Sequence, residues 1–84
     1  MYYIGIKQDG FNDENLLSEN SMNWLTYFNP DSKLKIQFAK LYNMSGVKTF
    51  DDINKAIALR DKVVEFGYDV IICELTEYEA KVIG

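Results

Sequence analysis

One stretch of this sequence, residues 49–67, has the apolar spacing of an amphipathic helix, and it limits the possible folds more than any other feature. The positions that recur near a helical period are Ile53, Ala56, Ile57, Leu59, Val63, Val64 and Phe66. Thr49 and Asp52 have the spacing of a capping box, and Gly67 is typical of a residue that ends a helix in the left-handed conformation. We therefore expect one main helix over about residues 50–66.

Stretches on both sides of this helix alternate apolar and polar residues, which is the period of a β-strand. They lie at residues 2–7 and 34–38; residues 24–28 form a further short candidate, and a run that is apolar on both faces follows at 70–75. The alternation breaks after residue 38, which predicts a bulge near Phe38 and Ala39. Residues 13–20 could form a short helical turn, and residues 43–46 a loop.

These elements predict an α+β fold: a small, mostly antiparallel sheet of three to four strands with the helix packed on one face. The chain has 84 residues, which is enough for a single domain spanning 1–84. Its hydrophobic content of 48% and aromatic content of 14% suffice for a compact core. We expect Trp24 to fill part of that core and leave open whether Tyr27 and Phe28 do so or form an interface.

The residue types needed for catalysis are largely missing. The chain has no histidine, which removes the commonest general base and metal ligand at neutral pH. Cys73 lies within the apolar run 70–75, so we expect a buried side chain rather than a nucleophile. The neighbouring Asp51 and Asp52 are better explained by the helix dipole than by a metal site, and the acidic residues around Gly10 lack calcium-loop spacing. We expect no enzyme activity, no cofactor and no metal.

The overall charge argues against direct binding to nucleic acid or to an anionic membrane. The formal net charge is -4, and no apolar run approaches the length that spans a bilayer. A basic leader followed by an apolar stretch is also missing at the N-terminus, and the single cysteine suits a reducing compartment. We expect a soluble protein in the cytoplasm. Local nucleic-acid contact through Lys33, Lys35 and Lys40 with Tyr42 stays a minor alternative.

Charge is segregated along the first half of the chain. Between Lys7 and Lys33 there is no basic residue, and the carboxylates of this interval are Asp9, Asp13, Glu14, Glu19 and Asp31. The next interval, residues 32–50, contains four lysines and no carboxylate. An acidic stretch of this kind is either a solvated loop or a patch that engages a basic surface. In the second interpretation, Tyr27 and Phe28 supply apolar anchors beside the acids.

The second half of the chain resembles known proteins. The strand ending in Phe-Ala-Lys-Leu-Tyr within residues 35–43, the helix with Ala56 and Ala58, and the run Gly-Tyr-Asp-Val-Ile-Ile at 67–72 carry the resemblance. Together they resemble small accessory proteins of phages and mobile elements of low-GC Gram-positive bacteria. Inhibitors of host defence nucleases, including anti-CRISPR proteins, belong to that group and act by binding. The resemblance covers roughly half the chain and names no target residue by residue.

The sequence therefore predicts a non-enzymatic protein–protein interaction module. We expect a phage-encoded inhibitor of a host defence nuclease, in which Asp9, Asp13, Glu14, Glu19 and Asp31 contact a basic groove that normally holds nucleic acid. One alternative is an oligomeric protein that sequesters a small molecule or nucleotide in a pocket lined by Tyr2, Tyr3, Lys33 and Lys35. Another is a small structural or regulatory phage subunit that associates with itself through a strand edge.

Overall fold

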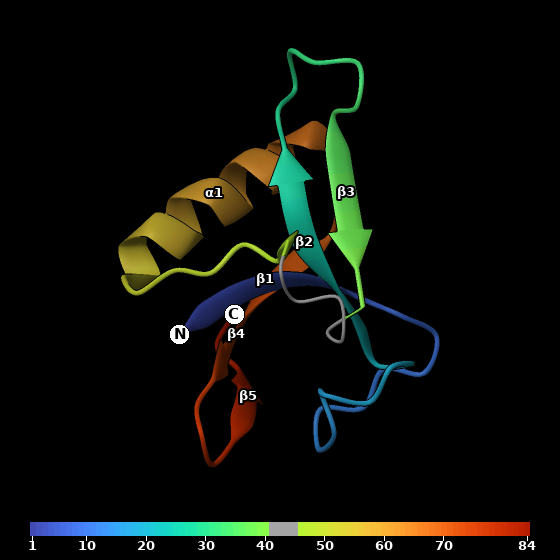
Figure 1. Cartoon of the computed structure of the whole chain (residues 1–84), viewed down its shortest axis with the longest axis vertical. Helices are drawn as coiled ribbons and strands as arrows, with labels where there is room; N and C mark the ends of the chain where they lie inside the picture. Colours follow the sequence, from blue (N-terminus) through green and yellow to red (C-terminus); the bar gives the residue numbers. More distant parts are fainter. Residues whose placement is uncertain (41–45) are drawn as a thin grey trace.

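The protein folds into one antiparallel sheet with a helix on one face. The computed structural model describes residues 1–40 and 46–84. The elements in chain order are β1 (Tyr2–Lys7), β2 (Met22–Phe28), β3 (Ile36–Ala39), α1 (Ile53–Phe66), β4 (Val70–Leu75) and β5 (Ala80–Val82). The sheet order is β3-β2-β1-β4-β5, and all neighbouring strands run antiparallel (Figure 1). The expected α+β fold is confirmed, with a strand count slightly above the three to four predicted.

The helix begins later than the sequence predicted. Its N-cap is Asp52, whose carboxylate accepts a hydrogen bond of 2.8 Å from the backbone N–H of Asn54. Thr49 lies outside the helix, so the proposed capping box between Thr49 and Asp52 is wrong. The reason is that Phe50 pairs with the start of β1: its N–H donates to the Tyr2 carbonyl and its carbonyl accepts from the Tyr2 N–H, at 2.9 and 2.8 Å. This bridge holds residue 50 extended.

The end of the helix follows the sequence prediction. Gly67 has φ 114°, in the left-handed region that favours glycine. Its N–H donates to the Val64 carbonyl, and the Tyr68 N–H donates to the Val63 carbonyl, which is the Schellman pattern. Tyr68 also packs against the hydrophobic cluster that contains Val63. This turn leads the chain directly into β4, which begins at Val70.

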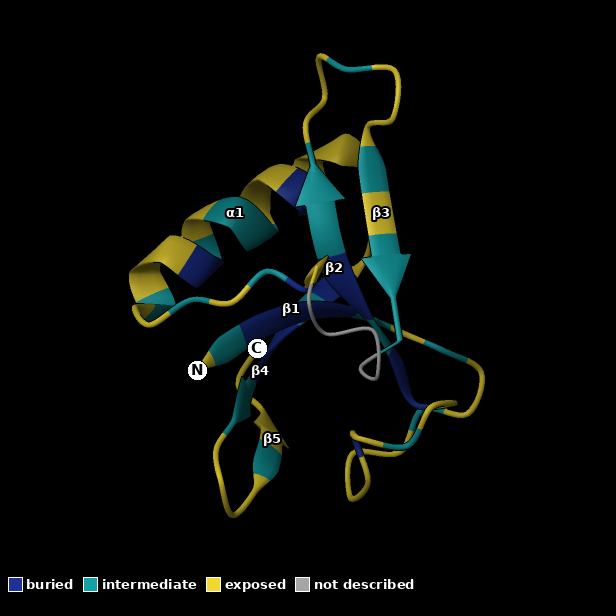
Figure 2. Cartoon of the chain, in the orientation of Figure 1, coloured by how far each residue is buried: buried dark blue, intermediate teal, exposed yellow. Residues whose placement is uncertain are grey.

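The sheet buries apolar residues on both faces. The helix side is formed by Ile4, Leu25, Ala56, Val63, Val70 and Ile72, and the opposite side by Tyr3, Leu16, Met22, Trp24, Val47 and Cys73. Successive strand residues point to opposite faces, which is how neighbours such as Tyr3 and Ile4 reach different clusters. Figure 2 shows the buried residues gathered on β1, β2 and β4. Trp24, only 1% exposed, fills the core as predicted, and so does the buried Cys73.

Residues 8–21 cover the face of the sheet opposite the helix. Leu16 is 2% exposed and packs into the cluster with Trp24. The buried Ser21 hydroxyl accepts from the Asn12 N–H and donates to the Asn12 carbonyl, which closes the segment on itself. The short helical turn predicted for residues 13–20 is wrong: successive turns replace it. Asn and Ser side chains compete for backbone hydrogen bonds and so weaken a helix here.

The strand edges differ from the sequence prediction in detail. β2 begins two residues earlier than expected, at Met22, and β3 spans Ile36–Ala39. The irregularity lies in β2, between Leu25 and Tyr27, rather than at Phe38 and Ala39. The Leu25 carbonyl accepts from the Lys48 N–H, and the Thr26 hydroxyl donates to the Gln37 carbonyl, which shifts the register locally. Of the loop predicted at 43–46, only Gly46 lies within the described residues.

Candidate functional site

The structure divides the predicted acidic patch between two places. Asp9, Asp13, Glu14 and Glu19 are exposed on the segment 8–21, which we call the acidic segment. Asp31 is exposed on the loop that joins β2 to β3, where its N–H is held by the Asn29 side chain at 3.0 Å. That loop projects at the top of Figure 1, and the acidic segment lies at the lower right. Asp31 therefore does not extend the surface formed by the other four carboxylates.

The two predicted aromatic anchors do not flank the acidic segment: Tyr27 contacts the β2–β3 loop, and Phe28 contacts α1. The Tyr27 hydroxyl donates a hydrogen bond of 3.0 Å to the Ser32 hydroxyl. Phe28 packs edge-on against Phe66 at the end of α1, with ring centroids 5.5 Å apart and planes at 80°. Both side chains are half-buried, and neighbouring positions in a strand point to opposite faces. The structure thus gives them separate packing roles.

The acidic segment meets a second acidic loop that sequence reasoning missed. Between β4 and β5 the chain reads Thr-Glu-Tyr-Glu, and this tip lies across a hollow of about 390 Å³ from the acidic segment. The residues that line it, which we call the acidic hollow, are Glu14, Asn15, Leu16, Leu17, Thr76, Glu77, Tyr78, Glu79 and Ala80. Residues 14–17 and 76–80, which are far apart in sequence, thereby bring three carboxylates together. In the sequence, the only indication of this site is that Glu77 and Glu79 closely follow the predicted strand 70–75.

Two apolar side chains in the acidic hollow are open to solvent. Leu17 is 53% exposed and Tyr78 is 91% exposed. An aromatic side chain on a chain this small normally contributes to the core, as Tyr3 and Trp24 do here. Leu16, next to Leu17, is buried and fixes the backbone of the acidic segment against the sheet. The hollow therefore has a fixed base below exposed apolar groups.

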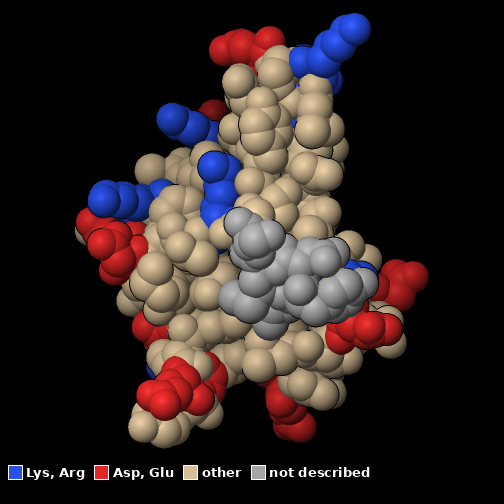
Figure 3. Space-filling view, in the orientation of Figure 1, with Lys and Arg blue, Asp and Glu red and all other residues tan. Residues whose placement is uncertain are grey.

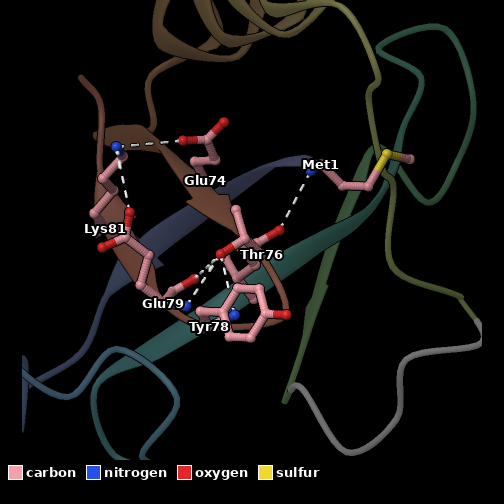
Figure 4. Close-up of polar contacts among 7 residues, drawn as sticks. Met1, Glu74, Thr76, Tyr78, Glu79 and Lys81 are labelled. Carbon is pink, nitrogen blue, oxygen red and sulfur yellow. Dashed lines mark hydrogen bonds and ion pairs between the residues drawn. The ribbon is translucent and has the colours of Figure 1, made fainter.

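The tip that carries Tyr78 is held by hydrogen bonds rather than by packing. The Thr76 hydroxyl accepts from the N–H groups of Tyr78 and Glu79, at 3.3 and 3.0 Å, and the Thr76 N–H donates to the Glu79 carbonyl at 2.8 Å (Figure 4). The terminal amine of Met1 donates to the Leu75 carbonyl at 3.3 Å. These bonds define the tip's backbone while leaving the Tyr78 ring free of the core.

Ion pairing leaves the acidic hollow negative. Lys81 lies 3.5 Å from both Glu79 and Glu74, and these carboxylates raise the pKa of the Lys81 ammonium, with Glu79 the stronger influence. Glu14 and Glu77 make no ion pair with any residue of 1–40 or 46–84. Figure 3 shows carboxylates over the lower end of the molecule, on the β4–β5 hairpin and on the acidic segment.

The other end of the acidic segment is closer to neutral. Asp9 lines a second hollow with Gln8, Gly10, Asn20 and Lys40. The Lys40 ammonium donates to the backbone carbonyl of Glu19. A cation is therefore anchored beside Asp9 and Glu19, which weakens the field that these two carboxylates can present to a partner. The unpaired negative charge of the segment is concentrated toward Glu14.

The single thiol is unsuited to nucleophilic chemistry. Cys73 is completely buried, and burial raises the pKa of its thiol to about 11, with Lys7 opposing the shift. Among the described residues, no group of three or more His, Cys, Asp or Glu side chains is arranged to hold a metal ion. No helix in this part of the chain is long and apolar enough to cross a membrane.

Comparisons with protein-family models, with curated proteins and with solved structures found no match.

The residues suggested for a nucleotide pocket lie apart from one another in the single chain. Tyr2 and Tyr3 lie on opposite faces of β1, where Tyr3 packs edge-on against Trp24 in the core, and Lys33 and Lys35 lie on the β2–β3 hairpin. The single chain therefore does not bring these four described residues to one pocket, and Tyr3 is buried in the core.

Proposed function

We propose that this chain is a non-enzymatic interaction module that binds a basic surface of a partner protein through the acidic hollow. The observation that carries the proposal is the meeting of residues 14–17 with residues 76–80. It combines the carboxylates of Glu14 and Glu77, which form no ion pair within residues 1–40 and 46–84, with the exposed apolar groups of Leu17 and Tyr78. Carboxylates of this kind steer a cationic partner toward the site, and apolar side chains supply affinity once the two surfaces meet.

The partner class follows from charge and from the sequence resemblance. A cationic groove that normally holds nucleic acid complements the hollow, and occupying that groove would inhibit the partner by competition. The resemblance to accessory proteins of phages and mobile elements suggests a host defence nuclease, as for anti-CRISPR proteins. Of the residues that the sequence predicted, Glu14 belongs to the proposed site, and Glu77 is added to it. Asp31, Tyr27 and Phe28 are left out because they lie on the distant β2–β3 hairpin.

The first experiment is capture of a partner with a charge-matched control. The tagged chain is exposed to a lysate of a low-GC Gram-positive bacterium that contains defence nucleases, and the captured protein is identified. The double variant Glu14→Gln, Glu77→Gln removes two charges from the hollow. The control, Asp31→Asn with Asp69→Asn, removes two charges elsewhere, on the β2–β3 loop and just before β4. Glu79 is left intact because it pairs with Lys81.

The expected result is capture of a nucleic-acid-binding protein that is lost in the hollow variant and kept in the control. Raising the salt concentration should weaken capture because the carboxylates are exposed and well screened. Nucleic acid added in excess should displace the chain from its partner. Capture that survives in the hollow variant, or that the control weakens equally, would contradict the proposal.

The apolar half of the site is tested separately. Leu17→Ser and Tyr78→Ser should each weaken binding to the captured partner. We expect the dissociation rate to rise about tenfold in each variant, as for the loss of an interface hot spot. Both residues are exposed, so the far-ultraviolet circular dichroism and the unfolding midpoint should not change. Unchanged dissociation rates in both variants would restrict the site to electrostatics.

A further inference from the structure

The opposite edge of the sheet has a second surface with different chemistry. β3 is the first strand in the sheet order, and within the described residues it pairs with β2 alone. The Lys35 carbonyl accepts from the Asn29 N–H at 2.8 Å, and the Gln37 carbonyl accepts from the Thr26 hydroxyl at 3.0 Å, so these residues face β2. Backbone groups alternate along a strand, so the N–H and C=O groups of Ile36 and Phe38 face away from the sheet.

Lysines stand at both ends of this edge. Lys33 and Lys35 precede β3, Lys40 follows it directly, and residues 32–50 contain no carboxylate. The Lys35 ammonium donates to the carbonyls of Pro30 and Ser32, at 3.0 and 3.4 Å, and that of Lys40 to the Glu19 carbonyl. Within residues 1–40 and 46–84, none of the three forms an ion pair. Two of these charges are therefore fixed in position, that of Lys35 on the β2–β3 loop and that of Lys40 beside Asp9 and Glu19 of the acidic segment.

We propose that the β3 edge accepts an extended, acidic segment of a partner protein as an additional strand. The outward groups of Ile36 and Phe38 would continue the backbone ladder, and the lysines would pair with carboxylates on the added strand. This surface is at the far edge of the sheet from β5 and the acidic hollow, so it is independent of the function proposed above.

Two other occupants fit the surface less well. A second copy pairing through its own β3 would bring another Lys33, Lys35 and Lys40 to the same short seam, and like charges across paired strands are destabilising. A nucleic acid would satisfy the lysines but has no peptide backbone to match the alternating N–H and C=O groups of an edge strand. Lysines beside an edge also discourage unspecific strand pairing, and the experiment separates that role from binding.

The test uses the full chain labelled for nuclear magnetic resonance and two blocked seven-residue peptides. One alternates glutamate with valine, and the other alternates lysine with valine. The acidic peptide should slow hydrogen exchange of the Ile36 and Phe38 amides by at least about tenfold, because these N–H groups become hydrogen-bonded. The basic peptide should leave both amides unchanged.

A matched pair of charge reversals locates the charge requirement. Lys33→Glu should weaken binding of the acidic peptide by about tenfold, a change of about 1.4 kcal/mol. Lys62→Glu makes the same charge change at an exposed position of α1 and should alter binding less than about twofold. The hollow variant Glu14→Gln, Glu77→Gln should bind the peptide as the unmodified chain does, which keeps this test separate from the proposed function.

Several results would overturn the proposal. Unchanged exchange at Ile36 and Phe38, or equal protection by the basic peptide, would show that the lysines only protect the edge. Protection of both amides that rises with protein concentration alone would indicate a second copy. Binding of a single-stranded oligonucleotide that perturbs the lysines, with no effect of the acidic peptide, would indicate a nucleic-acid surface.

Discussion

Tyr3 and Trp24 pack edge-on across the β1–β2 pair, with ring centroids 5.8 Å apart and planes at 72°. Both rings are almost fully buried, and Leu16 of the acidic segment belongs to the same cluster. The cluster around this aromatic pair therefore joins the centre of the sheet to the segment that carries Glu14. Stability of the core and the shape of the candidate site depend on the same aromatic pair.

Replacing Trp24 should therefore cost a large part of the stability. Truncation of a buried aromatic residue typically costs about 3–5 kcal/mol, and a domain of this size has a total stability on the order of 5–10 kcal/mol. We expect Trp24→Ala to lower the urea midpoint strongly, as followed by circular dichroism. The matched control is Tyr78→Ala, because that ring is 91% exposed and its loss should change stability by less than about 0.5 kcal/mol.

A side chain at Gly5 should destabilise the fold. A Cβ atom at this position would lie 2.5 Å from the end of Met22, 3.0 Å from the Trp24 ring and 3.1 Å from the Asn23 carbonyl. The Met22 end can move, but the ring and the carbonyl are fixed by the sheet, so Gly5→Ala should destabilise by about 1–3 kcal/mol. Gly46→Ala is the control, since its Cβ would meet nothing closer than 3.9 Å. Equal unfolding midpoints for the two variants would contradict this account.

The start of α1 offers a test with two adjacent aspartates. Asp52 caps the helix by accepting from the Asn54 N–H, whereas Asp51 makes an exposed ion pair of 3.9 Å with Lys55. Asp52→Ala should lower the free energy of unfolding by about 1 kcal/mol and Asp51→Ala by less than about 0.5 kcal/mol. Thermal unfolding measures both. A larger effect at Asp51 would show that the observed cap is not the one that matters in solution.

Cys73 should make stability fall at alkaline pH. Burial raises the pKa of its thiol from 9.0 to about 11 in the folded chain, so the unfolded chain loses this proton first. The resulting stabilisation is complete below about pH 9 and is lost as the pH rises toward 11, an effect on the order of 2 kcal/mol. The measurement is the difference between the pH profiles of the unmodified chain and Cys73→Ala, which isolates the contribution of this thiol. Parallel pH profiles would refute the prediction.

The sequence identified the core better than it identified the site. Alternation in residues 2–7 predicted β1, and the run at 70–75 that is apolar on both faces predicted β4, each with its observed bounds. Gly67 marked the end of α1. The start of α1 was missed because Phe50 pairs with Tyr2, a contact between residues far apart in the chain. β5 was missed because its three residues become a strand only by pairing with β4.

The candidate site shows the same limit more strongly. The acidic interval 9–31 was visible as a run of charge, but its members separate in space because β2 carries Asp31 away from the acidic segment. Glu77 and Tyr78 could not be assigned to the site from the sequence, because no nearby residue indicates that they lie close to Glu14. Their meeting depends on how residues 8–21 cross the sheet and on where the β4–β5 hairpin ends.

By itself, the sequence determined the fold class, the buried positions of Trp24 and Cys73 and the end of the helix. These depend on local periodicity, on side-chain hydrophobicity and on the backbone freedom of glycine, all of which a short window of residues contains. Only the tertiary structure decided that Glu14 faces Glu77 and Tyr78, and that β3 forms an outer edge with lysines at both ends. Both arrangements depend on strand order and register, which are set by contacts between distant segments.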